Sequence, residues 1–145
     1  MNPSAAPRLS DVDSIDSILH AMYDVISGPA GQTRDWDRFR SLHYPDAHLV
    51  PVVALAGQPA KARMLGAEDY IRRVEPIFAK EHFWERETRR ECETFGRVAH
   101  VLSYYESLRD PNGPPFESGV NSVQLFYDDS RWWILSVVWN TARSG

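Results

Sequence analysis

Five side chains of this sequence belong to the types that move or orient protons in enzymes: Tyr23, Asp24, His82, His100 and Asn121. Histidine gives or takes a proton near neutral pH, and a buried carboxylate beside it fixes its tautomer. Each side chain also has a structural interpretation. His100 and Asn121 lie in apolar segments, where they can be hydrogen-bonded members of the core, while Asp24 and His82 can face solvent. Residue types alone therefore leave their roles open.

The last third of the chain supplies elements that would position such residues. Its β-branched and aromatic residues predict three consecutive antiparallel strands, at residues 97–108, 117–128 and 131–141. A two-residue turn at Asp129-Ser130 would place Val123 opposite Ser136 and Tyr127 opposite Trp132. The three strands predict a sheet that the rest of the chain packs against.

Both faces of the final hairpin are mostly apolar, whereas a half-solvated sheet normally has one polar face. Helices of the same chain can cover one face, and a second copy of the chain can cover the other. We therefore expect a homodimer through the outer sheet face. The residues that motivate this prediction are Phe126, Trp133, Leu135, Val137 and Trp139.

The preceding residues predict helices and shorter strands. Apolar residues recur at helical spacing over 12–26, and further helices are expected at 34–42 and 66–80. A strand at 47–55 contains Pro51, which favours an edge or a bulge. Residues 82–95 form a highly charged strand. If one of its carboxylates points inward it becomes a candidate base, with Glu91 or Glu93 as the expected residue. The order predicts an α+β fold.

Composition narrows the class of protein. The chain has 145 residues, with 43% hydrophobic and 25% charged residues, as expected for one globular domain. We expect residues 1–9 to form a flexible tail and residues 10–143 to form a single domain. A net charge of −4 disfavours a nucleic-acid partner. Cys92 is the single cysteine, so neither an internal disulfide nor a thiol metal site is expected. No signal peptide or membrane span is predicted, which favours the cytoplasm.

Several motifs together resemble the NTF2-like superfamily, in the branch of SnoaL-like cyclases and scytalone dehydratase. They are Asp35-Trp-Asp-Arg38, Pro45-Asp-Ala47, Phe95-Gly-Arg-Val-Ala99 and the stretch from Tyr127 to Ile134. The resemblance covers about residues 11 to 141. It implies a cone in which three N-terminal helices pack on a curved, mainly antiparallel sheet around a ligand pocket.

The resemblance to scytalone dehydratase also implies site residues. It implies acid–base roles for His100 and for an Asp24–His82 pair. Asn121 would hydrogen-bond the substrate, and Tyr23 would orient a water or a carbonyl. Trp36 and Tyr104 are the further residues expected to contact substrate. The resemblance requires neither a metal nor an organic cofactor.

Two functions fit this pattern. The first is a cofactor-independent lyase (a dehydratase) or isomerase that acts on a small cyclic or polyketide-like carbonyl compound. Such a reaction removes a proton alpha to a carbonyl while another group polarises that carbonyl. The second is a non-catalytic ligand-binding or assembly module with the same fold, which would hold a small apolar ligand. Fold alone does not decide between them.

Overall fold

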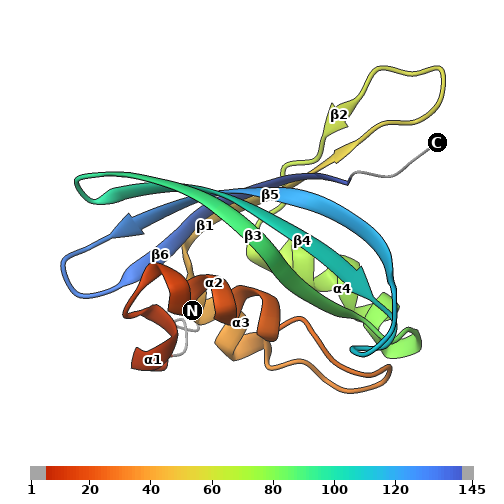
Figure 1. Cartoon of the computed structure of the whole chain (residues 1–145), viewed down its shortest axis with the longest axis horizontal. Helices are drawn as coiled ribbons and strands as arrows, with labels where there is room; N and C mark the ends of the chain where they lie inside the picture. Colours follow the sequence, from red (N-terminus) through yellow and green to blue (C-terminus); the bar gives the residue numbers. More distant parts are fainter. Residues whose placement is uncertain (1–5, 142–145) are drawn as a thin grey trace.

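The structure is a computed structural model of the chain and describes residues 6–141. Its helices lie on the concave side of one curved sheet (Figure 1). The helices are α1 (Leu9–Val12), α2 (Ile15–Asp24), α3 (Trp36–Leu42) and α4 (Ala67–Lys80). The strands are β1 (His43–Val53), β2 (Lys61–Ala62), β3 (Trp84–Phe95), β4 (Val98–Leu108), β5 (Pro115–Tyr127) and β6 (Trp132–Thr141). The predicted α+β architecture is confirmed.

The six strands follow the order β2-β1-β6-β5-β4-β3. β1 runs parallel to β6, and the other neighbours are antiparallel. This mainly antiparallel sheet curls around the helices, as expected for the NTF2-like cone. Part of the predicted N-terminal tail, residues 1–5, lies outside the described residues. Leu9 already belongs to α1, and Arg8 forms an ion pair with Asp35 at 3.2 Å.

The helix predicted over residues 12–26 is divided in two. Ser14 has an extended backbone and caps α2, because its side-chain oxygen accepts a hydrogen bond from the backbone N–H of Ser17 at 3.0 Å. Asp35 caps α3 in the same way, through the backbone N–H of Arg38 at 3.0 Å. A carboxylate at that position also favours the positive end of the helix dipole.

The turn prediction for the final hairpin is confirmed at its closed end and wrong farther along. Tyr127 pairs with Trp132, as expected, but Val123 pairs with Val137 instead of Ser136. A register shift between Gln124 and Leu125 adds one residue to β6 and changes which side chains face inward. Val137 therefore lies on the concave face, and so does Trp139, which faces the buried Asn121 across the strands. Both were predicted on the outer face.

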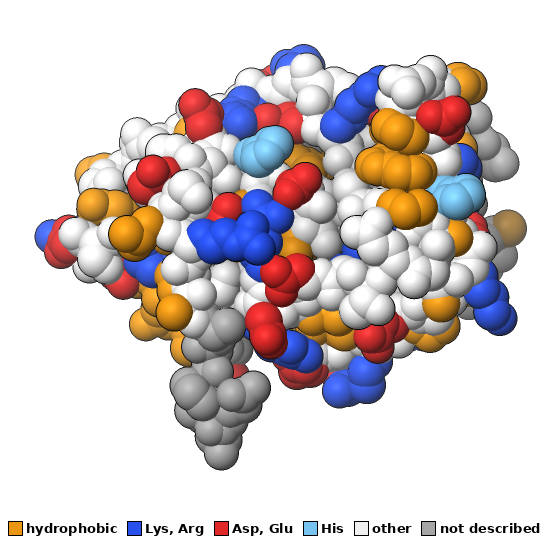
Figure 2. Space-filling view, turned by 90° about the horizontal axis from the view of Figure 1, so that it is seen from below, with side chains coloured by type: hydrophobic (Ala, Val, Ile, Leu, Met, Phe, Trp, Pro, Cys, Tyr) orange, Lys and Arg blue, Asp and Glu red, His pale blue; other side chains and the backbone are white. Residues whose placement is uncertain are grey.

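The core is formed where α2, α3 and α4 meet the concave face of the sheet. Ile18, Leu19, Leu42 and Ile134 are fully buried there. Seen from the helix side, acidic and basic side chains alternate across the surface (Figure 2). None of the helices within residues 6–141 is long and apolar enough to cross a membrane.

Candidate functional site

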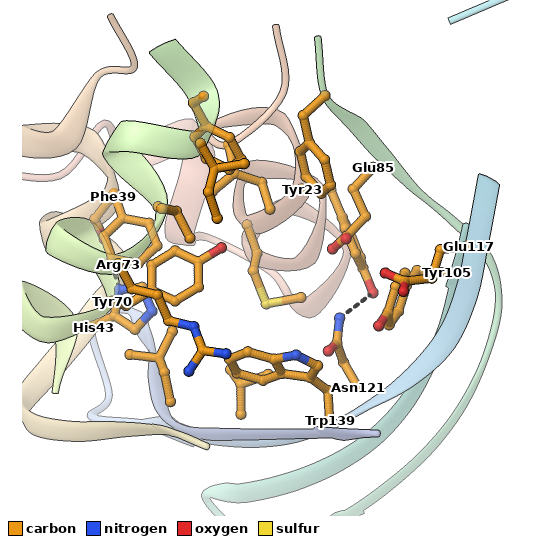
Figure 3. A pocket seen from close by; sticks show the side chains of 18 of the residues that line it. Tyr23, Phe39, His43, Tyr70, Arg73, Glu85, Tyr105, Glu117, Asn121 and Trp139 are labelled. Atoms are coloured by element: carbon orange, nitrogen blue, oxygen red, sulfur yellow. Dashed lines mark hydrogen bonds between the residues drawn. The ribbon is translucent and has the colours of Figure 1, made fainter. Parts of the chain in front are cut away.

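A cavity of about 290 Å³ lies between the concave sheet face and helices α2 and α4 (Figure 3). Exposed residues mark its mouth: Arg73 and Ile77 on α4, and Arg109 and Phe116 beside the β4–β5 connection. Arg109 lies over the Phe116 ring at 3.9 Å. The polar residues that line the cavity are Tyr23, His43, Tyr70, Arg73, Glu85, Tyr105, Arg109, Glu117 and Asn121. The remaining lining is apolar, as is usual for a small-molecule site.

A chain of hydrogen bonds crosses one wall of this cavity. The side-chain amide of Asn121 donates to the Tyr23 hydroxyl at 3.0 Å, and the hydroxyls of Tyr23 and Ser103 are 2.7 Å apart. Ser103 donates to the Glu87 carboxylate at 2.5 Å. Because the Ser103 proton points to Glu87, the Tyr23 hydroxyl must donate to Ser103. Tyr23 is thereby held in place, and the Asn121 Oδ1 and second N–H remain available to a ligand (Figure 3).

Arg90 anchors the far end of the chain of hydrogen bonds. It contacts Glu87 at 2.7 Å and also pairs with Asp16 at the start of α2. The network therefore ties α2 to strands β3, β4 and β5 across the cavity wall. A hydrogen-bond network of this kind, buried at its Tyr23 end, fixes side-chain positions.

Two carboxyl groups line this cavity, Glu85 and Glu117, and Glu85 comes from β3 (Figure 3). Ser107 donates a hydrogen bond to the Glu85 Oε2 at 3.0 Å, and the Ser27 hydroxyl accepts from the Glu85 backbone N–H at 3.0 Å. Burial raises the pKa of Glu85 from 4.5 to about 7, and Glu117 adds to the shift. Near neutral pH this side chain is therefore present both as an acid and as a base.

The Glu85 carboxylate also affects the pKa of three tyrosines in the cavity. Burial raises the pKa of Tyr23, Tyr70 and Tyr105, and the charge of Glu85 raises each of them further. All three are neutral hydrogen-bonding groups at physiological pH. Gly119 faces Tyr105 across β4 and β5, and a Cβ at that glycine would lie 2.5 Å from the Tyr105 hydroxyl. Because Gly119 has no side chain, the Tyr105 ring can lie against the backbone of β5.

The inward carboxylate arises from a bulge in β3. Before the bulge Glu85 pairs with Ser107 and Glu87 with Tyr105, and these side chains face the concave side. The register shifts between Glu87 and Arg89, so that Glu91 and Glu93 have the opposite parity and are exposed. The condition set for a candidate base, a carboxylate of this strand that points inward, applies to Glu85, and the choice of Glu91 or Glu93 was wrong.

The raised pKa of Glu85 predicts a pH-dependent stability. The protonated form favours the folded state below about pH 4.5, and this contribution is lost as the pH rises through about 7. Glu85→Gln mimics the protonated form at every pH. We expect the free energy of unfolding of the variant to rise relative to that of the wild type between pH 4.5 and 8, by at most about 3 kcal/mol. Urea unfolding at several pH values measures the difference, and a difference that does not change with pH contradicts this assignment.

His100 does not share the cavity with Asn121. It pairs with Gln124, and its Nε2 lies 3.1 Å from the Ser122 hydroxyl on the convex face. Asn121 pairs instead with the buried Ser103. The length of the β4–β5 connection decides this parity, and the sequence did not determine it. Tyr104 has the same parity as His100 and lies beneath Arg89, 3.8 Å from the guanidinium carbon to the ring centre.

The predicted Asp24–His82 pair is not formed. Asp24 accepts a hydrogen bond from Arg38 at 2.6 Å and is half exposed. The exposed His82 accepts one from the backbone N–H of Ala30 at 2.9 Å. The loop after α2 approaches the residue next to His82, where Gly28 makes an isolated bridge with Phe83.

Trp36 belongs to the core rather than to the cavity wall. Its ring stacks on Phe78 with centroids 6.4 Å apart and meets Phe39 edge-on at 5.4 Å.

Of the seven predicted site residues, Tyr23 and Asn121 line the cavity. Glu85 and His43 line it as well and were not chosen from the sequence; the alternation of a charged strand was the available signal for Glu85. Among residues 6–141, no three His, Cys, Asp or Glu side chains are grouped as metal ligands.

Comparisons with solved structures show the class of the fold. Neither the models of protein families nor the curated proteins that were searched match this sequence. Solved structures do match. An NTF2-like protein of unknown function from Silicibacter pomeroyi has a TM-score of 0.60 at 13% identity, over 89% of this chain and 93% of that chain. The chain has the NTF2-like fold.

Two further structures illustrate how widely the NTF2-like fold is shared. LinA has a TM-score of 0.65 at 12% identity, over 90% of this chain and 85% of that chain. A candidate dehydratase of the NTF2-like family from Streptomyces avermitilis has a TM-score of 0.63 at 19% identity, over 92% of this chain and 97% of that chain. Identities at this level show the shared fold, and the activity has to be argued from the site.

Proposed function

We propose that this NTF2-like protein binds a small cyclic or polyketide-like carbonyl compound and acts on it as a cofactor-independent lyase or isomerase. The observation that carries the proposal is the Glu85 carboxyl, whose pKa is about 7, inside a mostly apolar cavity. A general base works best when its pKa lies near the working pH. The likeness in fold to a candidate dehydratase agrees with this class of reaction.

The site supplies the two groups that such chemistry needs. The ionised Glu85 takes a proton from the carbon next to the substrate carbonyl. The free N–H of Asn121 donates a hydrogen bond to the carbonyl oxygen, where negative charge develops. In an isomerisation, Glu85 returns the proton to another carbon. In a dehydration, it gives the proton to the leaving hydroxyl group, and water departs with the bonding electrons. Both sequences leave Glu85 in its starting state.

Proton exchange at carbon tests the proposal before any substrate is known. Small cyclic ketones and β-hydroxy ketones are incubated with the protein in D₂O, and deuterium at the α-carbon is followed by NMR. We expect exchange above the uncatalysed rate for those compounds that bind. Binding without exchange would instead support the non-catalytic ligand-binding module, which the apolar lining of the cavity also favours.

We further propose a homodimer through the convex face of the sheet. After the shift that turns Val137 and Trp139 inward, apolar side chains remain exposed on that face, with Val98 48% and Val138 37% exposed. Sedimentation should give a dimer at micromolar concentration, and Val138→Glu should give a monomer. Leu55→Glu is the control, since that residue lies in the β1–β2 loop and is 61% exposed. A wild-type monomer would refute the proposal.

A further inference from the structure

His43 contributes a second polar group to the cavity, away from Glu85. It is the first residue of β1, directly after α3, and only 5% of its surface is exposed. Figure 3 shows it on the opposite side of the cavity from Glu85 and Asn121. The Phe39 ring centre lies 4.4 Å from the His43 ring, and the charge of Arg131 also acts on His43.

The contacts of His43 determine which of its nitrogens carries hydrogen. Nδ1 lies 2.8 Å from the backbone carbonyl oxygen of Phe39. A carbonyl oxygen only accepts, so Nδ1 must carry the proton and donate. Burial, together with the charge of Arg131, lowers the pKa of His43 to about 4, so the ring is neutral at pH 7. Nε2 is therefore a bare acceptor.

This acceptor is unsatisfied. Among the buried side-chain atoms of residues 6–141, His43 Nε2 is the one without a hydrogen-bond partner. Native proteins seldom leave a buried polar atom unpaired, and a ligand group that pairs with it recovers the lost interaction. His43 lines the cavity, but its Nε2 is itself closed to solvent, so a ligand that pairs with this atom must displace a neighbouring side chain.

We infer that His43 is a specificity-determining residue, whose Nε2 accepts a hydrogen bond from a hydroxyl or N–H group of the ligand. The inference rests on the proposed function of the same cavity and narrows its substrate class. The ligand then has two polar ends: a carbonyl or hydroxyl group near Asn121 and Glu85, and a hydrogen-bond donor near His43. Its middle is apolar and packs against residues such as Met22 and Trp139.

Matched alcohols and methyl ethers test the inference. The probes are 2-naphthol with 2-methoxynaphthalene, and cyclohexanol with methoxycyclohexane; each ether keeps the ring system, loses the donor and adds one methyl group. We expect the wild type to bind each alcohol at least about tenfold more tightly, as measured by NMR titration. His43→Phe should remove the preference. His48→Phe should keep it, because His48 lies on the same strand and is exposed.

The ¹⁵N resonance of His43 Nε2 in the wild-type protein gives a second measurement that requires no folded variant. It should move upfield when an alcohol binds and stay in place with an ether. A nitrogen already hydrogen-bonded in the free protein would indicate a trapped water and overturn the inference. Equal affinity for alcohol and ether would also overturn it while leaving the proposed reaction intact. Conversely, tighter binding of the alcohols without α-proton exchange of ketones would support the proposed role of His43 and reject the proposed lyase or isomerase reaction. Failure of all four probes to bind would overturn the inference about His43, and the exchange assay with ketones would then decide the proposed reaction by itself.

Discussion

Glu85→Gln is expected to lower the rate of α-proton exchange by about 100-fold or more, since general acid–base catalysis contributes roughly 10²–10⁴-fold. The amide keeps the size of the carboxyl group and still accepts the hydrogen bond from Ser107, but it cannot take a proton. Ligand affinity should change much less than the rate. The loss would therefore appear in the chemical step and not in binding.

The pH profile separates a catalytic role of Glu85 from a structural one. If ionised Glu85 is the base, the wild-type exchange rate falls as the pH drops through about 7. The residual exchange rate of the variant should not show this decrease with falling pH. Glu91→Gln is the matched control, because Glu91 lies on the same strand beyond the bulge and is exposed. A Glu85→Gln enzyme with the wild-type rate and pH profile would reject the proposed base.

Arg38→Met is expected to destabilise the fold by about 3 kcal/mol or more, since removing one partner of a buried ion pair leaves the other charge uncompensated. Arg38 makes two parallel contacts with the Asp11 carboxylate, at 2.9 and 3.0 Å, and Asp11 is 6% exposed. The guanidinium also holds the pKa of Asp11 below its usual range. Methionine keeps the apolar stem and removes the donors that join α3 to α1.

Asp24→Asn is the control for this prediction. Asp24 contacts the same guanidinium, but its side chain is 54% exposed, so its loss should change the unfolding free energy by less than about 1 kcal/mol. Urea unfolding compares the two variants. If the two variants were equally destabilised, the exposure of Asp11 and Asp24 would not explain how much each contact with Arg38 contributes to stability. The α-proton exchange rate of Asp24→Asn also tests the acid–base role that the sequence suggested for Asp24.

Local sequence patterns predicted most elements of this fold. Helical spacing of apolar residues located α2 and α4, and β-branched and aromatic runs located β4, β5 and β6 to within a few residues. Such patterns work because a helix or a strand repeats its side-chain directions over short, fixed intervals. The motifs around Asp35 and Pro45 added the NTF2-like class, which the solved structures support.

Local sequence patterns also predicted two residues that line the cavity. Tyr23 lies on the buried side of α2, where helical spacing placed the apolar face. Asn121 alternates with the apolar Val123 and Leu125 and so faces the core. Their hydrogen bond joins residues 98 positions apart, and only the packed structure reveals it.

The sequence by itself determined the elements, their order and the presence of an apolar interior. Tertiary structure decided which polar residues enter that interior. Strand parity reverses at a single inserted residue, so the bulge in β3 admits Glu85 and excludes Glu91, and the pairing of β4 with β5 turns His100 outward. Bulges and pairing depend on contacts between distant segments, and no short stretch of sequence encodes them.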